Sequence, residues 1–143
     1  MRSIYDDVAV RVSLGPDTYA DNGTFNGEAV DRMEGGARFT ESMVVVVLGE
    51  VTASYDGELK LQSSADGSSW TDVSSGLLVG EIPTVTTGNA ETVHVIGYKG
   101  EARFLRLVLT AAEAADQTAA VTGLVLMAPG GRVPMVQLPG EES

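Results

Sequence analysis

The chain has no cysteine and only one histidine, His94, in 143 residues. Without cysteine there is no disulfide framework, no thiolate metal site and no cysteine nucleophile. A single histidine cannot form a histidine cluster, and no Gly-x-Ser-x-Gly segment supplies a serine nucleophile beside it. The aspartates Asp17, Asp21 and Asp31 lack the alternating oxygen ligands and the closing glutamate of a calcium loop. We therefore expect no enzymatic activity, no cofactor and no bound metal.

Basic residues are also scarce, with 9 Lys and Arg against 20 Asp and Glu, which gives a net charge of −11. Such a chain has no basic stripe to neutralise phosphates, so we expect no nucleic-acid partner. The same charge argues against an anionic membrane as partner. No apolar run approaches the roughly 20 residues that span a bilayer, and Met1–Asp7 is too acidic for a signal peptide.

Glycine is abundant, at 17 residues, and serine, threonine, valine and leucine fill the stretches between the glycines. Short apolar runs separated by turn signals are typical of an all-β domain. We predict an all-β fold, a single-domain β-sandwich over residues 1–143. It should be of the jelly-roll type, with about eight short strands. Extended terminal segments are expected at 1–20 and 129–143.

Two segments carry the clearest strand patterns. In Asp7–Leu14 every second residue is apolar, which predicts a half-buried strand with one inward face. The inward residues would be Val8, Val10, Val12 and Leu14. Gly15-Pro16-Asp17 is expected to end this strand. Met43–Leu48 is apolar on both faces, which predicts a central strand or one with a face under a loop or a partner.

Two further strands are expected around residues 92–97 and 103–110. In the second, Leu105, Leu107 and Leu109 occupy every second position and should point inward, with Arg103 at one end of the strand. In the first, Val93 and Val95 share one face, so His94 between them should point away from the core.

The flanks of the chain have two interpretations. Residues 1–14 form either an ordinary strand of their own sandwich or an arm that adds to the sheet edge of a neighbour. Residues 132–143 follow a Pro-Gly-Gly break and include two further prolines, so we expect them to be extended. Candidate partner contacts in the flanks are Val8, Val10, Val12, Leu14, Val133 and Met135.

The most distinctive segment is Ser64–Trp70. Asp66-Gly67 predicts a hairpin turn. Trp70, three residues after Gly67, is interpreted as a structural anchor buried in the core, and a ligand-stacking role is the alternative.

A second distinctive segment, Gly100–Val108, contains Arg103, Phe104 and Arg106 as further candidate anchors. Arginines three positions apart lie on opposite faces of a strand, so these two should not form one basic site. We expect one of them to pair with a carboxylate and to pack its stem across the sheet. A phosphate or carboxylate site is the alternative.

These two segments together resemble the discoidin-type jelly roll. That family has a Ser-x-Asp-Gly-x-x-Trp hairpin and an Ala-Arg-Tyr-(Val/Ile)-Arg-Leu strand, and the matching segments here are Ser64–Trp70 and Ala102–Leu107. Discoidin domains are usually secreted, often disulfide-bonded and somewhat larger. The absence of cysteine therefore favours a second resemblance.

Small virion proteins of tailed bacteriophages, encoded among the head genes, are similar to residues 21–134 of this chain. The similarity consists of short motifs that occur here in the same order and at compatible spacing. The motifs are Gly27–Asp31, Met43–Gly49, Leu59–Gln62, Ser64–Val73, Gly97–Val108 and Arg132–Pro134. Asp7–Leu14 has no counterpart in the family pattern.

This resemblance implies a decoration or cement protein on the capsid exterior of the virion, made in the cytoplasm of the bacterial host. Its partner would be the major capsid protein, and it would work as a homodimer or homotrimer that bridges capsid subunits. One alternative is a low-copy head-completion or connector protein. Another is a carbohydrate- or cell-surface-binding jelly-roll module, for which a row of exposed aromatic side chains is the expected feature.

Overall fold

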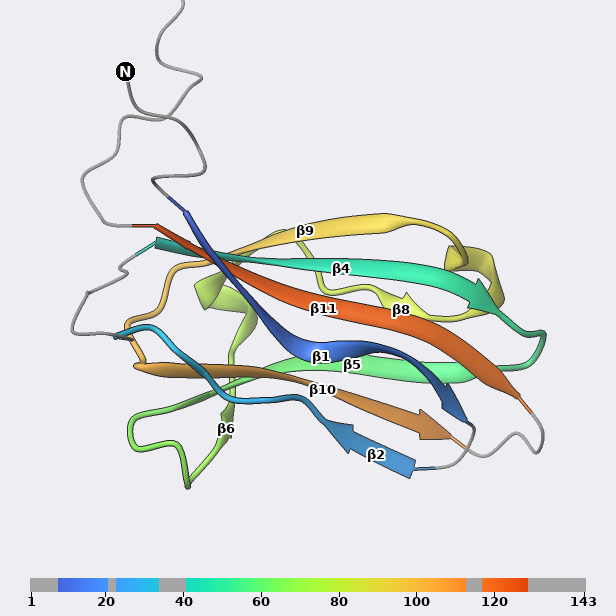
Figure 1. Ribbon diagram of the computed structural model, residues 1–143, viewed down its shortest axis with the longest axis horizontal. Helices are drawn as coiled ribbons and strands as arrows, with labels where there is room; N and C mark the ends of the chain where they lie inside the picture. Colours follow the sequence, from blue (N-terminus) through green and yellow to red (C-terminus); the bar gives the residue numbers. More distant parts are fainter. Residues whose placement is uncertain (1–7, 21–22, 34–40, 113–116, 129–143) are drawn as a thin grey trace, which may run out of the picture.

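The computed structural model describes residues 8–20, 23–33, 41–112 and 117–128, and nearly all of the regular structure is β. The strands form two antiparallel sheets, called sheet A and sheet B below. Figure 1 shows β9, β4, β11 and β1 of sheet A on one side and β5, β10 and β2 of sheet B on the other. No helix in these described ranges is long and apolar enough to cross a membrane.

Sheet A has five strands in the order β1-β11-β4-β9-β7. In that order their bounds are Ala9–Ala20, Thr118–Ala128, Glu41–Val51, Val93–Tyr98 and Leu78–Val79.

Sheet B has six strands, four of them in the order β2-β10-β5-β6, with β3 beside β10 and β8 beside β5. The bounds are Gly23–Asn26 for β2, Phe104–Ala112 for β10, Asp56–Ser64 for β5, Thr71–Asp72 for β6, Val30–Asp31 for β3 and Thr84–Val85 for β8. The short 3-10 helices η2 (Ser75–Leu77) and η3 (Thr87–Asn89) lie in the connections.

The all-β sandwich is confirmed, and the path of the chain is that of a jelly roll. The chain leaves sheet A after β1, returns for β4, and changes sheets at most of the later connections. Eleven strands are described instead of about eight. The difference comes from short strands, among them the two-residue pairings β7 and β8, which show no alternation to detect in the sequence.

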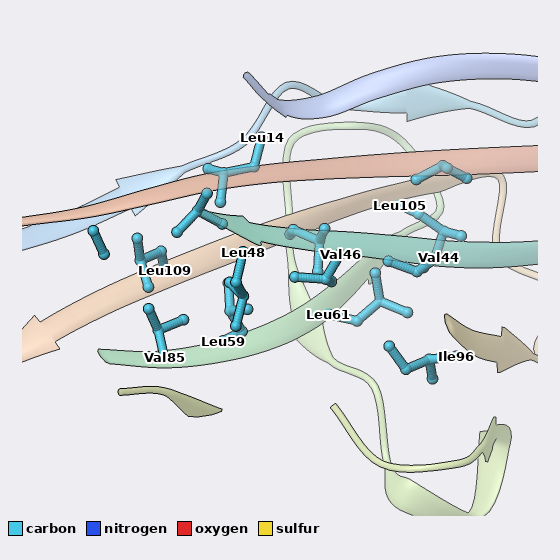
Figure 2. Close-up of a cluster of buried hydrophobic side chains, with 14 of the residues drawn as sticks. Leu14, Val44, Val46, Leu48, Leu59, Leu61, Val85, Ile96, Leu105 and Leu109 are labelled. Carbon is cyan, nitrogen blue, oxygen red and sulfur yellow. The ribbon is translucent and has the colours of Figure 1, made fainter. Parts of the chain in front are cut away.

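The core lies between the two sheets and is built from alternate residues of the long strands (Figure 2). On β10, Leu105, Leu107 and Leu109 point inward as predicted, and none is more than 1% exposed. The prediction of a central strand at Met43–Leu48 is also confirmed, because β4 pairs with β11 on one side and β9 on the other.

The N-terminal strand differs from its prediction. Val10 and Val12 are 49% and 45% exposed, whereas Leu14 is buried. The register gives the reason: Val12 pairs with Leu124 and Leu14 pairs with the neighbouring Gly123, so Ser13 is an extra residue on β1. This β-bulge reverses the alternation, and Leu14 reaches the core while Val10 and Val12 face outward.

The strand also continues through the expected break. β1 runs through Gly15-Pro16-Asp17 to Ala20, with a second register shift before Asp17. Because β1 pairs with β11 of its own chain, residues 9–14 form an ordinary strand and the arm interpretation is wrong for them. Val8 precedes the strand, and the candidate contacts Val133 and Met135 lie outside the described residues.

The bulge residue Ser13 joins the two sheets. Its hydroxyl donates a hydrogen bond to the Glu28 carbonyl (2.8 Å) and accepts one from the Leu107 backbone N–H of β10 (3.0 Å). The Gly27 N–H donates to the Leu107 carbonyl at 2.7 Å. The edge strand of sheet A is therefore held to sheet B by hydrogen bonds as well as by apolar packing.

Candidate functional site

The turn before Trp70 is held by a side-chain network. The Asp66 carboxylate accepts hydrogen bonds from the Ser68 and Ser69 N–H groups at 2.8 and 3.0 Å, and the buried Ser64 hydroxyl donates to it at 3.0 Å. These bonds favour the ionised carboxylate and hold the pKa of Asp66 below its ordinary value. Gly67 has φ +80°, a conformation that favours glycine. Asp66 and Gly67 thus determine the geometry of this turn.

Trp70 is not buried in the core. It is half-buried at the end of the turn, just before β6, and the Arg106 guanidinium carbon lies 4.3 Å from the centroid of its ring. The Arg106 Nε donates to the Gln62 Oε1 at 2.9 Å. Because Arg106 alternates with the inward Leu105 and Leu107, this contact lies on the outer face of sheet B. The core-anchor interpretation of Trp70 is therefore wrong.

The same outer face has further polar groups beside Trp70. The Gln62 amide donates to an Asp72 carboxylate oxygen at 2.9 Å, and the Lys60 Nζ lies 3.4 Å from the same carboxylate. The hydrogen bond from Gln62, and then the one from Lys60, lower the pKa of Asp72. Arg106, Gln62 and Asp72 form a chain of polar contacts along the surface.

Arg103 makes the ion pair expected of one of the two arginines. Its Nε and Nη2 donate to the two Asp31 carboxylate oxygens at 2.9 and 3.0 Å, and its guanidinium carbon lies 4.9 Å from the centroid of the Phe104 ring. The hydrogen bond from Arg103 is the main reason that the pKa of Asp31 is lowered. The opposite-face argument does not apply to Arg103, because β10 begins only at Phe104.

Arg32 is a residue that the sequence analysis missed. It is 3% exposed, and its Nη1 donates to the carbonyls of Ala102 (2.7 Å) and Gly100 (3.3 Å). Its Nε donates to the Ser42 hydroxyl at 2.9 Å, and its guanidinium carbon lies 5.0 Å from the centroid of the Tyr98 ring. A lone arginine after β3 carries no local signal of burial, because its partners come from distant parts of the chain.

The orientation of β9 is the reverse of the one expected. Val93 and Val95 are 62% and 57% exposed, whereas Ile96 is buried. His94 is half-buried, and its Nε2 shares a hydrogen bond of 2.8 Å with the Thr92 hydroxyl. The prediction that Val93 and Val95 share one face is correct. Ile96 and Tyr98, on the opposite face, are the residues of β9 that reach the core.

Two features of the described residues bear on possible chemistry: groups of side chains that could hold a metal ion, and hollows in the surface. No three His, Asp or Glu side chains among them are grouped to hold a metal ion. A hollow of about 290 Å³ at the end of sheet A is lined by Val8, Met43 and Leu126 among others, and Glu41 is its one titratable lining residue. Apart from Glu41 and Ser42, the side chains that line this hollow are apolar.

The outer face of sheet A is the main candidate surface, and we call it the apolar face. Three cross-strand rows of side chains form it. The first row is Val10, Leu126, Met43, Gly97 and Val79; the second is Val12, Leu124, Val45 and Val95; the third is Thr122, Val47 and Val93. No position in these rows is charged.

This face concentrates the exposed apolar side chains of the molecule. Of the nine large apolar side chains that are exposed in the described part of the chain, seven lie in these rows, and Leu77 and Met33 are the others. A contiguous exposed apolar patch of this kind marks a protein interaction site more often than scattered apolar residues do. The sequence indicated the part of the apolar face that β4 forms, since Met43–Leu48 is apolar on both faces.

Comparison of the chain with protein-family models, curated proteins and solved structures gave no match. The resemblance to phage virion proteins therefore rests on the order and spacing of its motifs alone.

Proposed function

We propose that this chain is a structural virion protein of a tailed bacteriophage. It would bind the outside of the capsid and stabilise the shell by bridging major capsid subunits. The motif series from Gly27 to Pro134 supports the choice of family. The apolar face of sheet A supports a protein that works by association with other proteins.

The apolar face is the observation that carries this proposal. An association protein needs a surface whose burial is favourable, and burial of apolar area contributes about 25 cal/mol per Å². The three rows supply such a surface on a sheet that the core and the Ser13 hydrogen bonds hold in place. A preformed surface also loses little conformational entropy on binding.

Bridging adds affinity through multivalency. A protein that contacts two shell subunits at once makes its second contact at high effective concentration, without any new type of interaction. The acidic charge of −11 fits an outer position, because it keeps the protein away from the packaged nucleic acid.

The carbohydrate-binding alternative has less support. Sugar-binding surfaces present open aromatic rings, but one face of the Trp70 ring is covered by Arg106. Tyr55 and Tyr98 are buried, and Tyr19 packs against Phe25 with ring centroids 5.0 Å apart. The described residues therefore contain no row of exposed aromatic side chains.

The decisive experiment is the copy number of this protein in purified particles of the phage that encodes it, measured by quantitative mass spectrometry. A copy number that scales with the number of capsid subunits is the expected result. A number that matches a single vertex or connector ring would support the head-completion alternative instead. Absence from washed particles would refute a virion role of any kind.

A second measurement tests the stabilising role. Heads from a phage that lacks the gene should break at a lower temperature or after a milder osmotic shock, and purified protein added to them should restore their stability. Heads of equal stability with and without the protein would contradict the bridging role.

A further inference from the structure

We propose that the apolar face of sheet A is covered by the same face of a second copy, related to the first by a two-fold axis. This inference rests on the association role proposed above and assigns the apolar face to a second copy, so that each copy of the dimer would contact the shell through another part of its surface. The contact would be sheet against sheet, with the cross-strand rows of each copy packed against those of the other.

The size of the face calls for a partner as broad as a sheet. Five strands spaced about 4.8 Å apart give it a width of about 19 Å, and the distance from Met43 to Val47 along β4 gives a length of about 13 Å. One extended segment is only about 5 Å wide, so a terminal segment of this chain would cover a single row. Both sheets of the described chain already pack against each other, so a second sheet has to come from another molecule.

The charge distribution restricts where two copies could meet. Each copy carries a net charge of −11, so two copies repel each other except where the contacting surface itself is uncharged. The apolar face has no charge between Glu41 and Glu50 on β4. The residues of β11 and β9 that pair with this part of β4 are also uncharged. Homodimer interfaces are more apolar than other interfaces, and this composition matches them.

The shape of the face suits such a contact. Its side chains are mainly valine, which is short and stiff, so the surface has the low relief of a sheet that packs on another sheet. Two such sheets pack about 10 Å apart with their strands within about 30° of each other. In a two-fold contact, when one residue meets a second residue of the partner, that second residue meets the first in return, so one self-complementary surface suffices for both copies. The exposed residues around the rows would form the rim.

The first test is the mass of the full chain in solution, by sedimentation or light scattering over a range of concentration. We expect twice the monomer mass of 14.9 kDa.

Val95→Lys puts a charge in the central row and should give a monomer, because each copy would then bury a lysine opposite an apolar surface. Val95 is 57% exposed, so the variant should fold. Thr110→Lys makes the same charge change at an exposed site on sheet B and should remain a dimer.

Cysteine substitution gives an independent test, because the chain has no cysteine of its own. Val12→Cys, Val45→Cys and Val95→Cys sample the central row, and under oxidation at least one should give a disulfide-linked dimer. Thr110→Cys should not. This test depends on proximity, so it remains informative if a lysine variant fails to fold.

Three results would overturn the inference. The first is a monomer at every concentration that can be reached. The second is a dimer that survives Val95→Lys and shows no crosslink in the central row, which would place the interface elsewhere. The third is loss of the dimer when the full chain carries the double substitution Val133→Asp, Met135→Asp. That loss would identify the C-terminal segment as the occupant of the apolar face. The copy number in particles is measured separately, so the two proposals can fail independently. A virion protein that is a monomer would refute only the dimer, and a dimer that is absent from virions would refute only the virion role.

Discussion

Trp70 contributes to stability through its contact with Arg106 and not through burial between the sheets. A fully buried tryptophan replaced by alanine costs about 3–5 kcal/mol. Here the ring is half-buried on the outer face of sheet B, so the lost energy comes from partial burial and from the cation–π contact. This difference changes what its replacement should do.

We expect Trp70→Ala to lower the free energy of unfolding by about 1–2 kcal/mol. Urea denaturation followed by circular dichroism measures this quantity. Trp70→Phe keeps an aromatic face under Arg106 and should lose less. A loss as large as that of a core residue would show that the ring is more buried than the structure indicates.

Gly27 is a position where the available space requires glycine. A Cβ atom there would lie 2.7 Å from the Leu107 carbonyl oxygen and 2.8 Å from the Ser13 carbonyl oxygen, and neither backbone atom can move aside easily. We expect Gly27→Ala to destabilise the protein by about 1–3 kcal/mol through this overpacking. Chemical denaturation is the measurement.

Gly15→Ala is the matched control for Gly27→Ala. It lies in β1, two residues after Ser13, but a Cβ atom at Gly15 would meet nothing within 4 Å. Its stability should be close to that of the wild type. An equal loss in both variants would mean that the close approach at Gly27 is not the cause.

Among the elements, β1 shows how one inserted residue reassigns a whole face. A strand with strict alternation would have placed Val10, Val12 and Leu14 on the same side. The bulge at Ser13 sends Leu14 into the core and leaves the two valines on the apolar face. The same residue ties β1 to β10, so the bulge also connects the two sheets.

Deletion of residues 1–14 should therefore leave a chain that does not fold. The deletion removes the first half of β1, the buried Leu14 and the Ser13 hydrogen bonds, and it exposes the edge of β11. Loss of the cooperative thermal transition and of amide dispersion in NMR is the expected result. A truncated domain that folds and loses only partner binding would restore the arm interpretation.

For the molecule as a whole, three surface carboxylates link stability to pH. Hydrogen bonds lower the pKa of Asp31, Asp66 and Asp72 in the folded protein. A carboxylate with a lowered folded pKa stabilises the protein above its unfolded pKa of about 3.9, and this stabilisation is lost as the pH falls through the folded pKa. Acid should therefore remove these contributions.

The clearest measurement compares the wild type with Asp66→Asn, which cannot ionise. Near neutral pH the wild type should be more stable, and the difference in free energy of unfolding should shrink as the pH falls below about 4. Comparison of the two proteins at each pH removes the change in overall charge repulsion, since both lose the same other carboxylate charges. A difference that grows in acid would contradict the assigned hydrogen bonds.

The sequence by itself determined the fold class, the central position of Met43–Leu48 and the inward leucines of β10, because these depend on local composition and on alternation with period two. Alternation states which residues share a face, but it does not state which face meets the core. That choice depended on contacts between distant segments, such as Ile96 on β9 and the bulge at Ser13 on β1.

Only the tertiary structure brought the candidate surface together. Its valines come from β1, β4, β7 and β9, and the pairing registers that align them into rows join residues far apart in the chain. The same holds for the burial of Arg32 and for the outward position of Trp70, since the groups that surround them belong to other strands and loops. Local sequence patterns report the propensity of a segment, whereas a surface or a buried charge is a property of several segments packed together.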